Sequence, residues 1–347
     1  MSSNLNLIRP ITVTDSILDS SNVLETPPTL YDAGTTYDEG DEVGVAGSNG
    51  EVLGYISLQG SNTGNTPASS PLYWLYTSST YEIYSGATSY ALDFIVTDTA
   101  THSLYKSLAA GNLGNALTDA TKWEYYSPTN TWAMFDEKFQ TQTYCAESIS
   151  VEVSPGEIVN SVALLNVEGA SATVTQTTSG YSRTISLVEH NVLNWYDWFY
   201  ELPIRTGDTV FSDIPPYPSD TLTITIDNAG GVARCGVCVI GKSKTLGETQ
   251  WDASRTINDY SQTSEDASGN VSLAQGSYSK RLNVDFYVMP GYESEVIRTL
   301  EQYRSTPLVF VGSEDYSASI VYGFLGAWGV PFSATGRKAY LEIKGLI

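Results

Sequence analysis

Residues 31–43 have the sequence YDAGTTYDEGDEV, residues 55–67 have YISLQGSNTGNTP, and Trp74 closes the unit. Residues 84–96 have YSGATSYALDFIV, residues 105–117 have YKSLAAGNLGNAL, and Trp123 closes this second unit. The copies differ in length at two places only. One is the loop from Val43 to Tyr55, or from Val96 to Tyr105 in the second copy, and the other is a single residue before the closing tryptophan. The aligned pairs are Tyr31 and Tyr84, Tyr37 and Tyr90, Val43 and Val96, Tyr55 and Tyr105, Ser57 and Ser107, Asn62 and Asn112, Gly64 and Gly114, Asn65 and Asn115, and Trp74 and Trp123. The chain therefore contains a tandem repeat.

Each copy has the periodicity of short strands. Residues 42–45 and 53–58 have strand-like patterns on either side of a Gly-Ser-Asn-Gly turn, which predicts a β-hairpin. Residues 62–67 have the composition of a turn. A unit of about fifty residues buries little apolar surface, so its aromatic residues must supply most of its core.

The composition indicates a globular, β-rich protein of two to four domains. Of 347 residues, 41% are hydrophobic and 16% charged. The 24 tyrosines and 7 tryptophans, together with abundant Thr, Ser, Val and Gly, are typical of strands joined by tight turns. Such rings also favour broad contact surfaces, because they combine apolar area with a polar edge.

The net charge of −22 argues against nucleic acid or an anionic bilayer as a partner. The N-terminal sequence lacks the pattern of a secretory signal, and no apolar run is long enough to span a membrane, so we expect no membrane insertion. Clustered acids such as Asp38, Glu39, Asp41, Glu42 and Glu51 are interpreted as a solvated face.

No residue pattern predicts a metal site, a cofactor or a catalytic set. Cys235 and Cys238 have the spacing of a zinc or redox pair, but they lie in the apolar run VARCGVCVIG without a second pair. We interpret them, with Cys145, as small buried residues of a protein made in a reducing cytosol. His102 and His190 lack the neighbours of a metal site, and no nucleophile elbow or phosphate loop is present.

The remainder of the chain predicts a β-sandwich followed by an α+β region. Residues 144–245 contain successive runs of alternating apolar and polar residues, which predict strands, and a turn is expected at 227–231. In the last hundred residues, 282–288 and 308–311 have strand patterns, and 294–303 have helical spacing. Trp132, Phe135 and Phe139 are expected to form an apolar knot joining the repeat to this remainder.

The predicted fold class is therefore mainly β. We expect two small tandem β-modules, a sandwich or jelly-roll-like domain, and a C-terminal α+β domain with one helix. The expected divisions are an N-terminal arm at 1–26, which is a docking segment or an extra strand, the first module at 27–77, the second module at 78–127, the sandwich at 128–245 and the α+β domain at 246–347.

The first copy resembles the small carbohydrate-binding modules of families 5 and 12, the chitin-binding type 3 modules. The resemblance rests on the Tyr37, Gly40-Asp41 and Val43 step, the Tyr-x-Ser strand, the Asn-x-Gly-Asn-x-Pro turn and Trp74. It implies that aromatic rings stack on sugars. The second copy has Leu92-Asp93-Phe94 in place of the Gly-Asp step and Leu117 in place of the proline.

The candidate glycan-binding rings are Tyr37, Tyr55, Tyr73, Trp74, Tyr105 and Trp123. The alternative is that the rings of the repeat form the module cores. Tyr76, Tyr81, Tyr125 and Tyr126 lie beside the repeat landmarks and are equally suited to stack on a sugar.

The stretch NTWAMFDEKFQTQT at residues 130–143, together with the chain beyond it, resembles structural proteins of tailed bacteriophages, and the likeness covers most of the sequence from residue 125 onward. The order of the C-terminal elements is similar to that of tail-tube and distal-tail proteins. The resemblance implies a virion tail component that assembles in a symmetric ring with copies of itself and other tail proteins. The modules would then bind host-surface polysaccharide during adsorption. The alternatives are a polysaccharide-degrading tail protein that uses an Asp/Glu pair, or modules that act only as spacers.

A dense aromatic segment supplies the candidate interface. Trp195, Tyr196, Trp198, Phe199 and Tyr200 crowd together in the sequence NWYDWFYELP. An exposed patch of this density would mark a contact surface. The alternative is a loop that packs over an open end of the sandwich.

Overall fold

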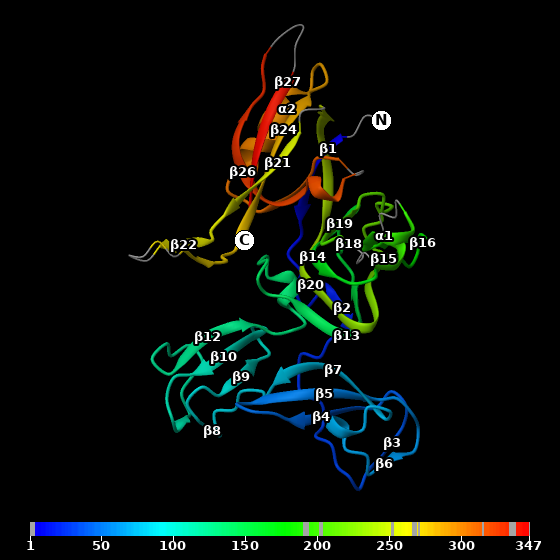
Figure 1. The fold of residues 1–347 in the computed structure, drawn as a ribbon, viewed down its shortest axis with the longest axis vertical. Coiled ribbons are helices and arrows are strands. Elements are labelled where there is room, and N and C mark those ends of the chain that lie inside the picture. The colour runs from blue at the N-terminus through cyan, green and yellow to red at the C-terminus, as the bar shows by residue number, and fades with distance from the viewer. Residues whose placement is uncertain are drawn as a thin grey trace.

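A computed structural model describes residues 4–189, 194–200, 204–250, 253–265, 269, 271–313, 316–332 and 338–346. The fold is mainly β, as the sequence predicted, and the predicted C-terminal helix is α2 (Glu293–Gln302). Figure 1 shows an elongated molecule with the two modules at one end, the sandwich in the middle and the C-terminal region at the other end.

The two modules repeat one architecture. Each has a three-stranded antiparallel sheet, β4-β5-β7 or β9-β10-β12, and a separate pair of very short strands, β3-β6 or β8-β11. The predicted hairpin of the first copy is confirmed, but the predicted turn at 62–67 begins as a strand that pairs with residues 36–37. The strands are β3 (Thr36–Tyr37), β4 (Glu42–Ala46), β5 (Glu51–Ser57), β6 (Asn62–Thr63), β7 (Trp74–Tyr81), β8 (Ser89–Tyr90), β9 (Ile95–Asp98), β10 (Ser103–Ser107), β11 (Asn112–Leu113) and β12 (Trp123–Pro128), with a short 3-10 helix at Pro67–Ser69.

The repeat landmarks form the same aromatic core in both modules. In the first, the ring of Tyr37 lies 5.2 Å from that of Trp74 at 70°, and in the second Tyr90 lies 5.4 Å from Trp123 at the same angle. The indole Nε1 of each tryptophan donates a hydrogen bond to a turn carbonyl, at 2.8 Å in the first module and 3.1 Å in the second. The repeated sequence therefore encodes a repeated core.

The modules contact each other through the turn between β4 and β5. Gly50 lies there with φ of +87°, and a Cβ at this position would overlap the carbonyl oxygen of Ile95 and the ring of Phe94. The amide of Ile95 donates to the carbonyl of Asn49 at 2.9 Å. A glycine is therefore required both by the backbone conformation and by the neighbouring module.

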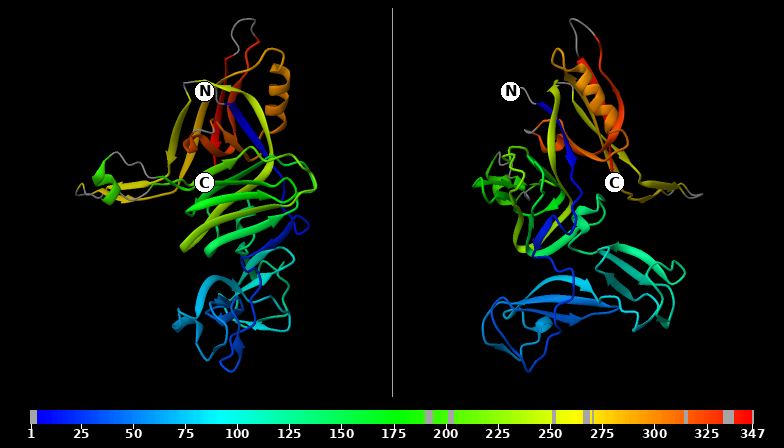
Figure 2. Two further views of the ribbon diagram at one scale, coloured as in Figure 1. Left: turned by 90° about the vertical axis from the view of Figure 1, so that its right-hand side faces the viewer. Right: turned by 180° about the vertical axis from the view of Figure 1, so that it is seen from behind.

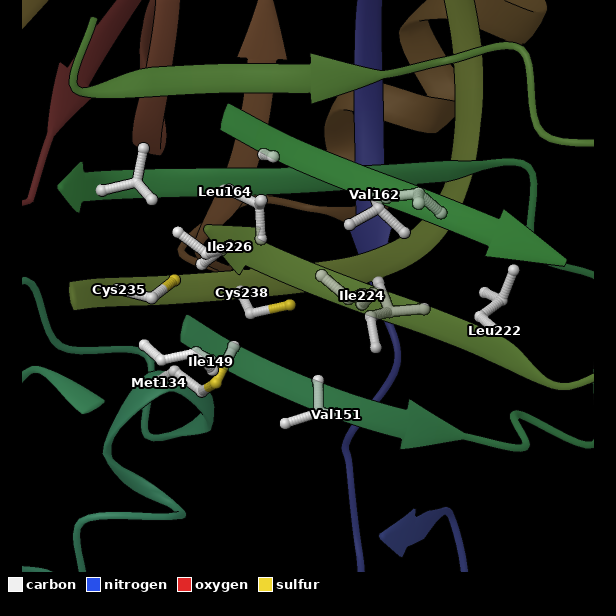
Figure 3. Close-up of a cluster of buried hydrophobic side chains, with 14 of the residues drawn as sticks. Met134, Ile149, Val151, Val162, Leu164, Leu222, Ile224, Ile226, Cys235 and Cys238 are labelled. Atoms are coloured by element: carbon white, nitrogen blue, oxygen red, sulfur yellow. The ribbon is translucent and has the colours of Figure 1, made fainter. Parts of the chain in front are cut away.

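Beyond the modules, the sandwich is built on a single long strand, β20 (Leu222–Thr249). Its first part pairs with β13 and β15, and its later part pairs with β13, β14 and β1. Side chains from β13, β14 and both parts of β20 meet in one buried cluster (Figure 3). The other elements around it are β2 (Leu18–Ser21), β13 (Thr143–Val153), β14 (Ser161–Glu168), β15 (Ser171–Gln176), β16 (Tyr181–Ser186), β17 (Val188–Glu189), α1 (Trp195–Tyr200), β18 (Ile204–Arg205) and β19 (Asp208–Phe211), with a 3-10 turn at Ala133–Phe135.

The turn predicted at residues 227–231 is present, but it lies inside strand β20: the run from Leu222 to Ile226 and the run from Cys235 to Cys238 proceed in opposite directions (Figure 3). Strand β13 stays paired with β20 across this point, where its register moves from Ser148 opposite Asp227 to Ala146 opposite Val232. Four residues, 228–231, therefore lie opposite the single residue Glu147, whose φ is +64°. The Asn-Ala-Gly-Gly segment therefore reverses the chain within a strand that stays paired on both sides of the turn.

The C-terminal region shares its sheet with the sandwich. Strand β20 runs through the division predicted between residues 245 and 246, and β1 from the N-terminal arm pairs with both β20 and β25. Helix α2 packs on this sheet through Val296 and Leu300. The elements are β1 (Asn4–Pro10), β21 (Ser254–Asp259), β22 (Gln262–Glu265), β23 (Val271–Ala274), β24 (Tyr278–Tyr287), β25 (Leu308–Val311), β26 (Ile320–Gly329) and β27 (Lys338–Gly345), with a 3-10 turn at Ser317–Ser319.

The three cysteines are buried, as predicted, and Cys235 and Cys238 lie on β20 within the sandwich core (Figure 3). Burial raises the pKa of the Cys145 thiol to about 11 and that of Cys235 to about 12. These thiols are therefore protonated and sequestered at neutral pH.

The predicted apolar knot is divided between two places. The rings of Trp132 and Phe135 pack together at 6.0 Å, whereas Phe139 packs 6.0 Å from Tyr322 in the C-terminal region. Trp132 also stacks on the imidazole of His102 at 4.0 Å, which brings it against the second module. The joint is thus polar and aromatic rather than purely apolar.

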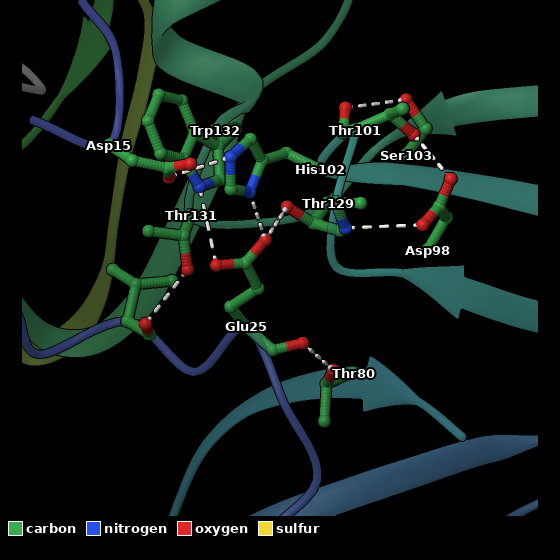
Figure 4. A network of polar contacts seen from close by, with 12 residues as sticks. Asp15, Glu25, Thr80, Asp98, Thr101, His102, Ser103, Thr129, Thr131 and Trp132 are labelled. Carbon is green, nitrogen blue, oxygen red and sulfur yellow. Dashed lines mark hydrogen bonds and ion pairs between the residues drawn. The ribbon is translucent and has the colours of Figure 1, made fainter. Parts of the chain in front are cut away.

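Glu25 ties the modules to the remainder of the chain (Figure 4). Its Oε1 lies 2.7 Å from Nδ1 of His102 and accepts from the Thr129 hydroxyl at 3.2 Å. Its Oε2 accepts from the Trp132 indole at 3.3 Å, and its backbone carbonyl accepts from the Thr80 hydroxyl at 2.6 Å. One residue of the N-terminal arm therefore contacts both modules and the joint.

The contact at Gly50 leads to a stability prediction. We expect Gly50→Ala to destabilise the protein by clearly more than the ~1–2 kcal/mol that a left-handed alanine costs, because its Cβ also meets the second module. Gly64→Ala is the matched control, since Gly64 has φ of +72° and open space around it. Urea unfolding of both variants measures the difference, and equal losses would contradict the account.

The contacts of Glu25 lead to a prediction about shape. We expect Glu25→Ala to cost about 1–3 kcal/mol, since it leaves the donors of Thr129 and Trp132 without their acceptor. The modules should then move relative to the remainder, which increases the radius of gyration in small-angle X-ray scattering. Glu39→Ala, on an exposed turn, should leave the scattering unchanged. An unchanged profile for Glu25→Ala would show that other contacts fix the modules.

Candidate functional site

The structure places most of the candidate glycan-binding rings in the module cores. Trp74 and Trp123 are each only 2% exposed. Tyr37 and Tyr55 are buried in the same cluster as Trp74, in the first module. Tyr73 and Tyr105 are half-buried and pack against the same clusters. The four buried rings have no free face to stack on a sugar, which corrects the assignment based on the resemblance.

A surface cleft lies instead where the two modules meet the sandwich. It has a volume of about 480 Å³, which is within the range of small-molecule sites. Strand β7 supplies one wall, strands β10 and β12 supply a second, and the segment from Thr129 to Tyr144 supplies the third. The cleft is therefore formed by residues 79–81, Leu104 and the continuous stretch of chain from Tyr126 to Tyr144.

Three tyrosines line the cleft. Tyr144 is fixed, because its hydroxyl lies 2.7 Å from Oγ of Ser79 and its backbone hydrogen-bonds the side chain of Asn130. Within the described residues, no hydrogen bond engages the hydroxyls of Tyr81 or Tyr126, and Tyr126 is exposed. The cleft thus combines one rigid ring with two that are available to a ligand.

Burial and neighbouring groups keep the hydroxyl of Tyr81 neutral. Burial is the main reason that the pKa of Tyr81 rises to about 12, and the charge of Glu51 adds to the shift. The group is therefore a phenol at neutral pH and both donates and accepts hydrogen bonds.

The described lining of the cleft contains no charged side chain. Besides the tyrosines it consists of neutral polar groups and a few apolar ones: Ser79, Thr80, Ser127, Thr129, Asn130, Thr141, Gln142, Leu104, Pro128 and Ala133. Such a surface offers hydrogen bonds and ring faces, but no carboxylate, histidine or cysteine for acid–base or nucleophilic chemistry.

Among the described residues, no group of three or more His, Cys, Asp or Glu side chains is arranged to hold a metal ion. In the same part of the chain, no helix combines the length and apolar character needed to cross a bilayer.

The candidate interface residues lie on α1, a short helix that the sequence analysis did not anticipate. Trp195, Tyr196, Phe199 and Tyr200 are between 66% and 80% exposed, and the side chain of Trp198 lies outside the described residues. The four described rings do not cover an end of the sandwich, so the alternative of a packed loop is wrong for them. They form an exposed aromatic surface.

The sequence contained partial signals for the cleft. Tyr81 and Tyr126 were among the rings beside the repeat landmarks, whereas Tyr144, Asn130 and Gln142 were not singled out, since they follow the repeat and match no motif. No protein-family model, no curated protein and no solved structure matches this chain.

The burial of Trp74 leads to a prediction about the modules. We expect Trp74→Ala to destabilise the first module by about 3–5 kcal/mol, because it removes a buried ring and the indole hydrogen bond at 2.8 Å. Leu72→Ala, at a neighbouring exposed position, is the control and should have little effect. Thermal unfolding followed by near-ultraviolet circular dichroism measures both. A folded Trp74→Ala module of unchanged stability would contradict the core assignment.

Proposed function

We propose that this chain is a structural component of a bacteriophage tail that binds neutral glycans of the host surface in the cleft between its modules and the sandwich. The observation that carries the binding proposal is the uncharged, tyrosine-lined cleft on a chain with a net charge of −22. The tail assignment is supported by the sequence resemblance from residue 125 onward.

The chemistry of the cleft matches that of a neutral sugar. A sugar ring presents an apolar face of C–H groups, which packs on an aromatic ring, and a rim of hydroxyls that hydrogen-bond neutral polar side chains. Tyr126 and Tyr81 supply rings and phenols, and Gln142 and Ser127 supply further polar groups. An anionic ligand finds no cation among the described lining residues, and the acidic chain repels it.

Weak binding in one cleft becomes useful when several copies act together. A shallow polar site typically gives modest affinity, but linked sites raise the effective concentration of the second contact and thus the avidity. A ring of tail proteins would display one such cleft per copy. This supports adsorption as the role of the cleft.

The test is binding of neutral host-surface oligosaccharides to the full chain by calorimetry. We expect Tyr126→Ala and Tyr81→Ala each to weaken binding by about tenfold, equivalent to about 1.4 kcal/mol, since each removes a ring face and a hydroxyl. Tyr217→Ala, at an exposed tyrosine of the sandwich, is the matched control and should bind like the wild type.

Two results would contradict the proposal. One is equal binding by all three variants, which would place the glycan elsewhere. The other is release of reducing ends from host polysaccharide by the wild-type protein, which would identify a degrading enzyme rather than a binding protein.

A further inference from the structure

Helix α1 carries an aromatic surface that the sandwich leaves uncovered. Its rings form two pairs one helical turn apart: Trp195 lies 6.3 Å from Phe199, and Tyr196 lies 5.0 Å from Tyr200. All four are at least 66% exposed. Contiguous aromatic exposure of this kind marks contact surfaces, and aromatic residues are enriched at the cores of protein interfaces.

A second exposed apolar surface lies on the hairpin of β22 and β23. These strands form a separate two-stranded sheet, in which Leu273 pairs with Thr263 and Val271 with Glu265. Val271 is 62% exposed and Leu273 is 75% exposed, and their spacing puts both on one face of the hairpin. A lone two-stranded ribbon is marginally stable in water, so a partner on this face would stabilise it.

The two surfaces are well separated on the molecule. In Figure 1, α1 and β22 project to opposite sides at a similar height along the long axis, whereas the view turned by 90° in Figure 2 shows both projecting to the same side. They are too far apart to meet within one chain. A contact between different surfaces of two copies is heterologous, and its repetition closes a ring when the rotation between copies allows it.

We infer that the α1 surface of one copy binds the β22–β23 hairpin of the next copy, which makes this pair the repeating contact of a ring. The occupant of the aromatic surface is thus a second copy of this chain. This inference rests on the assembly part of the proposed function and names the surfaces that assemble; it does not depend on the glycan cleft.

The area of the aromatic surface is consistent with this contact. Four aromatic side chains of about 150–250 Å² each, exposed by 66% to 80%, offer roughly 400–700 Å². A standard interface buries about 800 Å² on each partner. The four rings therefore account for at least about half of one side of a standard interface.

The charge of the chain sets the conditions for assembly. Two copies that each carry −22 repel one another at long range, and salt screens this repulsion while leaving an apolar contact intact. Association of wild-type protein should therefore strengthen as the ionic strength rises. An ionic interface would show the opposite dependence.

The decisive experiment is cysteine cross-linking between two variants of the full chain at high ionic strength. One carries Phe199→Cys and the other Leu273→Cys, and the native cysteines do not compete because all three are buried. Oxidation of the mixture should give covalent dimers that neither variant forms alone. Replacing Phe199→Cys by Phe332→Cys, at another highly exposed phenylalanine, is the control and should abolish them.

Two outcomes would overturn the inference. Cross-linking of Phe199→Cys with itself would show that the aromatic surfaces meet face to face, and absence of dimers in the mixture would show that the hairpin is not the partner. Sedimentation velocity gives a second measurement: Phe199→Ser and Leu273→Ser should each weaken association at least tenfold, and Phe332→Ser should not. Oligosaccharide binding by Phe199→Ser should stay unchanged, so loss of assembly and loss of glycan binding are separable.

Discussion

The carboxylate of Glu25 is the group around which the junction between the modules and the sandwich is built. It lies where the N-terminal arm passes between the modules and the sandwich, and it accepts hydrogen bonds from Thr129 and Trp132 while contacting His102. Thr80, which bonds the backbone of the same residue, and Thr129 both line the cleft. The same arm begins with β1, which lies between β20 and β25 in the extended sheet. Glu25 is therefore one of the contacts, with the hydrogen bond between Ser79 and Tyr144, that join the walls of the cleft.

The tandem repeat shows what a sequence pattern does and does not reveal. Spacing of tyrosine, asparagine and tryptophan predicted two copies of one small β-unit, and the copies share ring geometry and indole hydrogen bonds. The same residues suggested a sugar-stacking platform, yet they are the cores of the modules. A unit this small has few other apolar residues to bury, so its most regular aromatic positions are its structural ones. The rings available to a ligand, Tyr81 and Tyr126, lie just outside the repeated pattern.

Elsewhere, local patterns predicted elements better than the connections between them. Alternation correctly predicted β24 and helical spacing correctly predicted α2, because both depend on nearby residues. The turn at 227–231 was predicted, but not that the residues on both sides of it pair with β13 around Glu147, about eighty residues away in sequence. For the same reason the cleft was not predicted: its walls come from β7, β12 and the segment after Thr129, and no local pattern records that they meet.

The central claim is that a glycan binds where the modules meet the sandwich, and hydrogen exchange of the full chain with and without neutral host-surface oligosaccharide tests it most directly. The account predicts slower exchange in segments 79–81 and 126–144, which line the cleft. It predicts no change in strands β4 and β5 of the first module. Protection confined to other segments, or none at saturating oligosaccharide, would contradict it.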